Sequence, residues 1–246
     1  MPNLLVIGGT DSSGGAGVSA DIETISYLGG KCLPIITAVT AQGNNGLFHS
    51  HAIPASILAN QLDSIDEQKI DAVKIGMIPN HELIEVIASY LKNIGTTSIV
   101  LDPVIKSSSG SSLISDSTAK SLRDLLFPNV SLVTPNLFEA KFFTEENYTN
   151  HDQYATLADQ LIKSGANAVL LKGGHLDGPR CEDIFLSSNG EKITMEHDRI
   201  PNGTEVRGTG CRLASCICYY LAMKEPMPKA ISLGVTYLQG YISRNI

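Results

Sequence analysis

The sequence predicts an α/β fold in which a mainly parallel sheet lies between two layers of helices. Apolar stretches typical of buried strands occur at 4–7, 34–40, 72–75, 98–101, 131–134 and 168–171. Amphipathic stretches typical of helices lie between them, near 19–28, 55–65, 82–93, 117–126 and 153–164. This alternation indicates a parallel sheet covered on both faces. With 246 residues, 43% of them apolar and 17% charged, residues 1–246 are expected to form one domain.

The chain opens with a strand, a glycine-rich loop and a helix. Residues 4–7 are all apolar, and Ile22, Ile25 and Leu28 recur at the spacing of one helix face. The later strand-like stretches are each followed by a helix-like stretch in the same way, which is the pattern of successive crossover connections.

The pattern changes after residue 172. Residues 183–186 and 192–196 flank Asn189-Gly190, which is a strong signal for a tight hairpin. We therefore expect antiparallel strands at one edge of the sheet. Two further helices, at 210–223 and 227–243, are expected to follow the hairpin.

Composition excludes several classes of function. The formal net charge is −7 and no basic stripe is present, so nucleic acid and anionic membranes are not expected as partners. No apolar run reaches the roughly 18 residues that a membrane span needs. The five cysteines form no paired framework, and the residues after Met1 do not resemble a leader, so we expect a cytoplasmic protein.

Polar and glycine residues follow six of the predicted strands. In open α/β sheets ligands bind outside the carboxyl ends of the strands, where these segments meet. The six segments are Gly8 to Gly17, Ala41 to Gly46, Gly76-Met77, Asp102 to Val104, Pro135 to Glu139 and Gly173 to His175. The sequence therefore predicts one ligand cleft at this edge of the sheet.

A seventh segment, 207–211, is typical of an anion site. Gly208 and Gly210 allow a sharp turn with exposed N–H groups, and the helix behind them adds the positive end of its dipole. Cys211 lies in the first turn beside Arg207 and Arg212, so its pKa is expected to lie below that of a free thiol. The alternative is a simple helix start with a small buried cysteine.

Two common nucleotide motifs are excluded. Residues 15–20 match G-x-G-x-x-A, but the match begins well after the first strand, and residues 24–62 contain no Asp or Glu to bind a ribose. The chain also lacks the G-x-x-x-x-G-K-[ST] loop. Neither a nicotinamide dehydrogenase nor a Walker-type ATPase is indicated.

Seven motifs at strand ends and helix starts together resemble a known family, and they span nearly the whole chain. They are Gly9-Thr10-Asp11-Ser12-Ser13-Gly14-Gly15-Ala16-Gly17 with Asp21, Thr37-Ala38-Val39-Thr40-Ala41-Gln42, Lys74-Ile75-Gly76-Met77, Leu101-Asp102-Pro103-Val104, Thr134-Pro135-Asn136-Leu137-Phe138-Glu139-Ala140, Leu171-Lys172-Gly173-Gly174-His175 and Gly208-Thr209-Gly210-Cys211. The sequence resembles the ribokinase-like small-molecule kinases, and among them the hydroxymethylpyrimidine and phosphomethylpyrimidine kinases of thiamine biosynthesis. The resemblance implies a ribokinase-like three-layer α/β/α sandwich with antiparallel edge strands.

The resemblance also implies a reaction and a substrate pocket. The γ-phosphoryl group of ATP would pass to the hydroxymethyl group of 4-amino-5-hydroxymethyl-2-methylpyrimidine, an aminopyrimidine, and then to its monophosphate. The positions that match the pyrimidine pocket are Gly9, Asp21, Gln42, Met77 and Val104. Without the family, Asp21 reads as a solvated helix residue, Gln42 as a turn residue, and Met77 and Val104 as core.

Asn136, Lys172 and Thr209 match ATP-binding positions, and Asp102 and Glu139 match positions that organise Mg²⁺ through water. Carboxylates suit such a hydrated ion. Asn136 and Glu139 also fit a capping box, and the two roles can coexist. Lys172 could instead be solvated at the end of its strand. His175 is a weaker candidate for an ATP contact and could be an ordinary loop residue.

The amides of Gly208, Thr209 and Gly210 are expected to stabilise the transferring phosphoryl group, and Cys211 to accept the hydroxyl proton. Arg207 and Arg212 depart from the family, which usually has His and Thr there. Their guanidinium groups would bind triphosphate or a phosphorylated substrate, or would simply be surface charge.

Two other functions remain open from the sequence. A pyridoxal or pyridoxine kinase would accept a similar hydroxymethylated ring, and a pyrimidine-sensing module would keep the pocket without catalysis. The resemblance also implies a homodimer.

Overall fold

One mixed sheet organises the protein. The computed structural model describes residues 1–43, 46–65, 69–95, 97–106, 110, 112–144, 154–174 and 178–246. Within these ranges the sheet has nine strands: β1 (Asn3–Gly9), β2 (Lys31–Gly43), β3 (Gly46–Ala52), β4 (Ala72–Ile75), β5 (Ser98–Leu101), β6 (Leu132–Val133), β7 (Ala168–Leu171), β8 (Arg180–Ser187) and β9 (Lys192–Asp198).

The strands lie in the order β3-β2-β1-β4-β5-β6-β7-β8-β9. The six from β2 to β7 are parallel, whereas β3, β8 and β9 are each antiparallel to the strand before them. The chain reaches β2 from β1 and then returns past β1 to β4. The carboxyl ends of the parallel strands therefore meet on both sides of this reversal, which is where ligands bind in open sheets.

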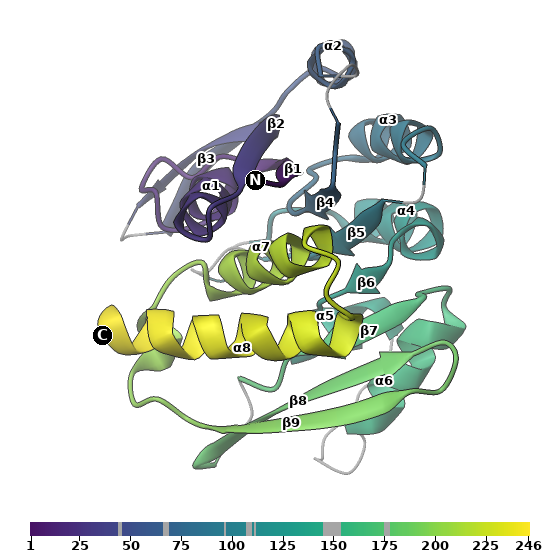
Figure 1. Ribbon diagram of the computed structural model, residues 1–246. Coiled ribbons are helices and arrows are strands. Elements are labelled where there is room, and N and C mark those ends of the chain that lie inside the picture. The colour runs from purple at the N-terminus through teal and green to yellow at the C-terminus, as the bar shows by residue number, and fades with distance from the viewer. Residues whose placement is uncertain are drawn as a thin grey trace.

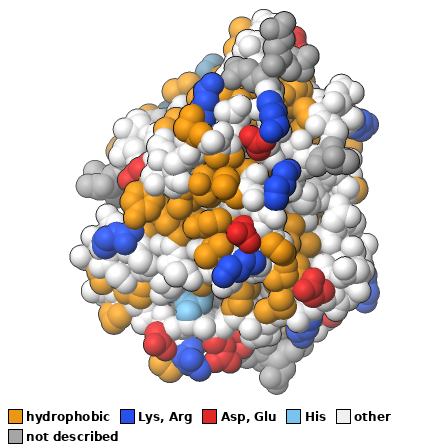
Figure 2. All heavy atoms as spheres, in the orientation of Figure 1, with side chains coloured by type: hydrophobic (Ala, Val, Ile, Leu, Met, Phe, Trp, Pro, Cys, Tyr) orange, Lys and Arg blue, Asp and Glu red, His pale blue; other side chains and the backbone are white. Residues whose placement is uncertain are grey.

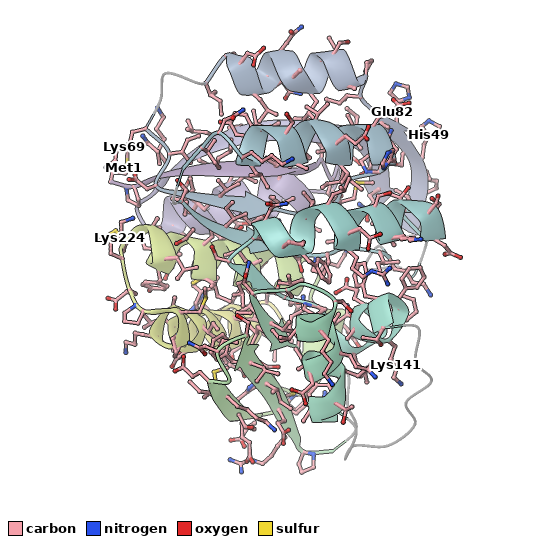
Figure 3. The ribbon with its side chains drawn as sticks, turned by 90° about the vertical axis from the view of Figure 1, so that its right-hand side faces the viewer. Met1, His49, Lys69, Glu82, Lys141 and Lys224 are labelled. Atoms are coloured by element: carbon pink, nitrogen blue, oxygen red, sulfur yellow. The ribbon has the colours of Figure 1, made fainter. Side chains whose placement is uncertain are left out.

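The helices form two layers. One consists of α1 (Gly17–Tyr27), α7 (Thr209–Ala222) and α8 (Met227–Arg244), which lie in front of the sheet in Figure 1. The other consists of α2 (Ala55–Asp63), α3 (His81–Leu91), α4 (Asp116–Leu126), α5 (Leu137–Thr144) and α6 (Tyr154–Lys163), which face the viewer in Figure 3. Two 3₁₀ turns, η1 (Phe127–Asn129) and η3 (Gly203–Glu205), complete the described elements.

The two-residue period of the strands divides the core between the two layers. Leu4 and Val6 of β1 pack in the cluster under α7 and α8, whereas Leu5 and Ile7 pack in the cluster under α2 to α6. All four side chains are fully buried. A strand buried on both faces must be apolar throughout, which is why the short apolar stretches could be recognised.

Three strands, β4, β5 and β7, have the predicted bounds, and the predicted helices begin and end within two residues of the observed ones. The prediction of antiparallel strands at one edge was incomplete, because both edges have them. The strand β3 was missed, since residues 46–52 contain two histidines and three exposed positions and are not continuously apolar. It extends β2 as an antiparallel arm beyond the carboxyl end of β1.

The two ends of the sheet differ. In Figure 3, Met1, Lys69 and Lys224 lie at the end where strands begin, and His49 and Lys141 lie at the end where the parallel strands finish. Figure 2 shows that hydrophobic side chains, interspersed with charges of both signs, spread across the face that α7 and α8 cover. In the described part of the chain, no helix has the length and apolar character that crossing a membrane requires.

Candidate active site

A cavity of about 710 Å³ opens at the carboxyl ends of the parallel strands. Each of six strands contributes a residue at or just beyond its end. These residues are Gly9, Gln42, Met77, Asp102, Asn136 and Lys172. The predicted cleft is therefore present, and it collects side chains from segments that are up to 163 residues apart in the sequence because parallel strands all finish at one edge.

The start of α7 forms a backbone loop on one wall of the cavity. Gly208 precedes the helix with a φ of +69°, and Gly208, Thr209, Gly210 and Cys211 all line the cavity. The first N–H groups of α7 have no partner within the helix, so they and the helix dipole favour an anion here. A Cβ atom at 208 would collide with the carbonyl oxygen of Gly15, so the two glycine loops pack backbone against backbone.

A lysine–aspartate pair faces this anion loop. Lys172 Nζ lies 3.0 Å from Asp102 Oδ1, and a Cβ atom built at Gly210 would lie 3.2 Å from Lys172 Nζ and 3.6 Å from Asp102 Oδ2. Burial alone would raise the pKa of Asp102, but Lys172 and then Lys74 outweigh it and hold that pKa below its usual value. The site thus presents an ionised carboxylate and an ammonium beside the loop.

Asn136 and Glu139 form the predicted capping box at the start of α5. Asn136 N donates to Glu139 Oε2 at 2.8 Å, and Glu139 N donates to Asn136 Oδ1 at 2.9 Å. Both residues also line the cavity, so capping does not remove them from it. Burial, with Asp102 adding its charge, raises the pKa of Glu139 to about 7 although Lys172 opposes the shift.

These two acids fit a hydrated divalent cation. The carboxylates of Glu139 and Asp102 are buried and line the cavity. The raised pKa of Glu139 means that the protein alone compensates its negative charge poorly. A hard cation that keeps most of its waters needs only one or two carboxylates. Among the described residues no group of three or more His, Cys, Asp or Glu could hold a metal ion.

Four of the residues that match the pyrimidine pocket also line this cavity, and together they are called the small-ring pocket. They are Gly9, Gln42, Met77 and Val104, and their binding of a ring stays a prediction. A Cβ atom at Gly9 would lie 3.0 Å from Met77 Sδ, so a side chain at this position would crowd the thioether. The pocket therefore combines an apolar wall with the carboxamide of Gln42.

Asp21 does not take part in this pocket, which corrects its predicted role as a substrate ligand. Its side chain is fully buried and lies outside the set that lines the cavity. Asp21 Oδ2 accepts from Lys74 Nζ at 2.8 Å, and Oδ1 accepts from Ser215 Oγ at 2.7 Å. Both oxygens are thus used inside the protein.

Lys74 is the residue that the sequence reasoning missed. It lines the cavity although only 1% of its side chain is exposed, and the neighbouring Asp21 raises its pKa against the effect of burial. The available signal was its position inside the buried strand 72–75, because a lysine is almost never fully buried unless it is paired.

The predicted pKa of Cys211 is wrong in direction. Burial raises the pKa of this thiol to about 12, and Lys74, the strongest group that opposes the shift, does not overcome it. The expected help from neighbouring arginines is missing, because Arg207 and Arg212 both have other partners. Cys211 is therefore a neutral thiol at pH 7 in the ligand-free protein.

Arg212 is neither an anion ligand nor surface charge. Its side chain is 3% exposed, pairs with Glu23 of α1 at 2.8 Å and lies 4.2 Å from the ring centroid of Tyr241 of α8. It ties α7 to the two helices beside it and lies outside the cavity lining. The guanidinium group of Arg207 likewise does not line the cavity, and it pairs with the carboxylate of Asp11 at 3.1 Å. Neither guanidinium group lines the cavity, so of the alternatives left open the contact with triphosphate is not favoured. His175 and part of the loop 105–112 lie outside the described residues.

Comparison with known proteins agrees with this geometry. The family profile "Phosphomethylpyrimidine kinase" matches residues 11–246. A hydroxymethylpyrimidine/phosphomethylpyrimidine kinase of Rhizobium meliloti is 38% identical over 241 residues, which cover 97% of this chain and 90% of that protein. A thiamine biosynthesis bifunctional protein of Geobacter sulfurreducens is 35% identical, but the chain spans only 49% of its length.

Solved structures share the fold. The phosphomethylpyrimidine kinase of Clostridium difficile is 33% identical and superposes with a TM-score of 0.85 over 98% of this chain and all of that one. A Bacillus subtilis pyridoxal kinase in an ADP complex is 27% identical, with a TM-score of 0.85 over 96% of this chain and 89% of that one. The shared fold and these relatives thus show a kinase of the ribokinase-like class. Within that class, the chain belongs to the phosphomethylpyrimidine kinase family.

Proposed function

We propose that this protein transfers the γ-phosphoryl group of ATP to the hydroxymethyl group of 4-amino-5-hydroxymethyl-2-methylpyrimidine, and then to the resulting monophosphate, in thiamine biosynthesis. One observation carries the proposal: the anion loop and the Lys172–Asp102 pair lie in the same cavity as the small-ring pocket at Gly9, Gln42 and Met77. A ring in that pocket would present its substituent to groups that neutralise phosphate charge.

Phosphoryl transfer depends mainly on positioning and charge neutralisation. The backbone N–H groups of Gly208, Thr209 and Gly210 would donate to the oxygens of the transferring group, and the Lys172 ammonium would bind the same oxygens from the opposite side. Asn136 would donate from its carboxamide to the nucleotide phosphates. Ile200, Leu238 and Ile242 line the same cavity and offer an apolar surface to a base.

We propose Mg²⁺ as the cation, held through water by Glu139 and Asp102. The cation would neutralise charge on the phosphates of ATP. Its binding would require ionised Glu139, so the chain itself contributes a carboxylate whose pKa lies at about 7.

We propose Cys211 as the acceptor of the hydroxyl proton. With a pKa of about 12, roughly one thiol in 10⁵ is ionised at pH 7, but a rare thiolate of high pKa is also a strong base. Turnover per active site should then rise about tenfold for each pH unit between pH 7 and 9 when all substrates are saturating. A turnover number that stays flat over this range would assign the proton to the ionised Asp102 instead.

A coupled assay with ATP and three acceptors tests the function. The aminopyrimidine alcohol and its monophosphate are both expected to be phosphorylated, and pyridoxal at least about tenfold more slowly, because one misplaced polar group in a pocket changes binding by about that factor. Faster turnover of pyridoxal would identify a pyridoxal kinase, an alternative that the Bacillus subtilis neighbour keeps in view. Binding of the pyrimidine without ATP consumption would identify a sensing module.

We further propose that residues 1–246 form one domain, because both helix layers pack on a single sheet. The free state of all five cysteines supports a reducing compartment, the cytoplasm. A homodimer is supported by Val39 and Phe48, which are exposed on the β2–β3 arm. Light scattering on the purified protein measures the mass that decides this last point.

A further inference from the structure

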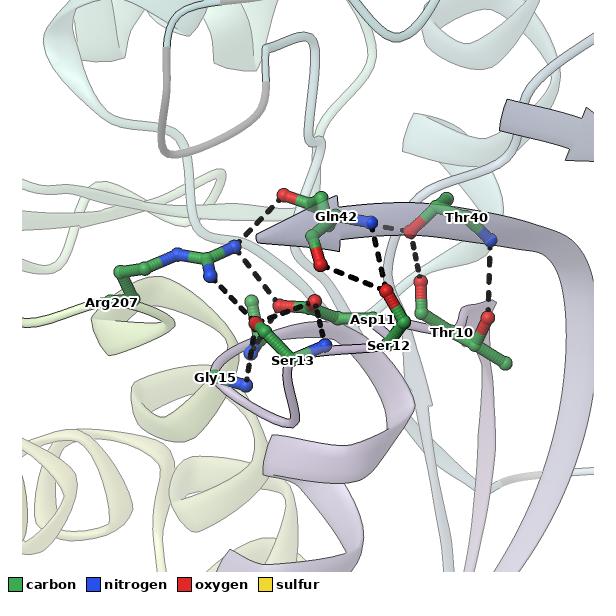
Figure 4. A network of polar contacts seen from close by, with 9 residues as sticks. Thr10, Asp11, Ser12, Ser13, Gly15, Thr40, Gln42 and Arg207 are labelled. Atoms are coloured by element: carbon green, nitrogen blue, oxygen red, sulfur yellow. Dashed lines mark hydrogen bonds and ion pairs between the residues drawn. The ribbon is translucent and has the colours of Figure 1, made fainter. Parts of the chain in front are cut away.

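A polar cluster joins Gln42 of the ring pocket to Arg207, Asp11 and Ser13, which have no role in the function proposed so far. Arg207, in the loop before α7, donates to Asp11 Oδ2 at 3.1 Å, to Ser13 Oγ at 2.6 Å and to Gln42 Oε1 at 3.0 Å (Figure 4). The carboxylate of Asp11 is fully buried and also accepts from Ser13 N, Ser13 Oγ and Ala16 N. The guanidinium thus joins the glycine-rich loop to the end of β2.

The contact with Arg207 fixes the orientation of the Gln42 carboxamide. A guanidinium has only donors, so the Gln42 atom that faces it must be the oxygen Oε1. The nitrogen Nε2 then points the other way and donates to Thr40 Oγ1 at 3.3 Å. Thr40 Oγ1 in turn donates to the carbonyl of Thr10 at 2.7 Å, so it has lone pairs left to accept from Nε2.

The chain of hydrogen bonds therefore runs in one direction, from Arg207 and Gln42 towards Thr10. Gln42, Thr40 and Thr10 all line the cavity, whereas Arg207 does not. Among these contacts Gln42 keeps one N–H of Nε2 on the side of Thr40, which lines the cavity, and one lone pair of Oε1 on the side of Arg207, which does not. Gln42 can then donate from Nε2 to a ring in the pocket, whereas its oxygen, which keeps one further lone pair, is held on the side of Arg207.

We propose that Arg207 is a positioning residue that sets the polarity of Gln42, so that the pocket selects a ring carrying an acceptor nitrogen at this edge. The proposal rests on the proposed function, because it takes the aminopyrimidine ring as the ligand. Arg207 itself touches no substrate. Without the guanidinium, the carboxamide is free to turn by 180°, and the preference for an acceptor is lost.

Calorimetric binding of three rings to the ligand-free protein tests the proposal. The first is the aminopyrimidine alcohol, and the other two are its deaza analogues, in each of which one ring nitrogen is replaced by C–H. The wild-type protein should bind one analogue about tenfold more weakly than the parent ring, which corresponds to one lost hydrogen bond. In Arg207→Ala this penalty should fall below about threefold, because the turned carboxamide no longer depends on the nitrogen.

Two further variants distinguish a role of Arg207 in orienting the Gln42 carboxamide from a role in stabilising the glycine-rich loop. Ser13→Ala removes the shortest contact of Arg207 without touching Gln42, so it should keep the tenfold penalty. Gln42→Glu keeps a partner for Arg207 but has no N–H donor, so it should bind the parent ring and both deaza analogues with similar affinity. This variant provides a second measurement if Arg207→Ala folds poorly. Thermal unfolding of each variant checks that the pocket is intact.

The outcomes are distinct. If Arg207→Ala weakens all three rings by the same factor, or keeps the penalty, Arg207 only braces the loop and the proposal is wrong. If the wild-type protein binds the parent ring but shows no preference among the three, Gln42 does not read a ring nitrogen, which again contradicts the proposal while leaving the proposed function in place. If the wild-type protein binds none of the rings, the proposed function fails as well.

Discussion

Two lysine–aspartate pairs lie behind the anion loop, and they differ mainly in exposure. Lys74 and Asp21 have side chains that are 1% and 0% exposed, and they close on each other at 2.8 Å beneath the cavity. Lys172 and Asp102 are 14% and 3% exposed, and they face the cavity directly at 3.0 Å. Lys172 can therefore leave Asp102 to bind a ligand in the cavity. Lys74 and Asp21 neutralise each other whether or not a ligand is present.

The comparison shows that the same lysine–aspartate pair has a different role depending on whether solvent and ligand can reach it. A sealed ion pair holds its surroundings in place, because removing either charge strands the other in a medium of low dielectric constant. A pair at the wall of a cavity keeps an ammonium ready for phosphate, because solvent and ligand can replace the carboxylate. The first two predictions below test this division, and the third tests the glycine loop beside the pairs.

The largest effect is expected for Lys74→Met, which leaves Asp21 buried without its cation. The free energy of unfolding should fall by about 3–5 kcal/mol in urea denaturation. The double variant Lys74→Met with Asp21→Asn should recover at least half of that loss, since the stranded charge is gone. A single variant as stable as wild type would mean that the sealed pair does not hold this region.

Lys172→Met should reduce turnover and leave the fold nearly unchanged. We expect kcat to fall by about 10²–10³, the usual cost of removing one group that stabilises developing charge, with a loss of unfolding free energy below about 2 kcal/mol. Lys106→Met is the matched control, because Lys106 also lines the cavity but packs 4.0 Å over the ring of Phe138. Equal losses in the two variants would contradict a special role for Lys172.

The smallest effect concerns the anion loop in front of the two pairs. Gly208 and Gly14 have similar φ values, +69° and +75°, but a Cβ atom would collide with the Gly15 carbonyl only at 208 and would meet nothing within 4 Å at 14. Gly14→Ala should cost about 1 kcal/mol from its backbone conformation alone. Gly208→Ala should cost about 1–3 kcal/mol more, as overpacking does, and lower turnover at least about tenfold. Equal costs at the two positions would mean that the glycine loops do not depend on close packing.

Much of the site could be predicted, and the failures have a common cause. The motif residues at strand ends, such as Gln42, Met77 and Lys172, meet in the cavity because parallel strands all finish at one edge. The charges around Cys211 could not be predicted, because they depend on where long side chains turn. Arg207 turns back to Asp11 and Arg212 turns towards α1 and α8. The prediction assumed that arginines next to Cys211 in the sequence also place their guanidinium groups next to its thiol. The long arginine side chain makes that assumption unsafe.

The sequence by itself determined the alternation of strands and helices, the edge of the sheet where ligands bind, the capping box of α5 and the turn before α7. These follow from local periodicity, backbone conformation and the fixed direction of parallel strands. Only the tertiary structure decided that Asp21 is sealed with Lys74, that Cys211 is a neutral thiol and that Gln42 is held from behind by Arg207. Burial and pairing across distant segments set the charge of a group, and no local pattern records which segments will meet.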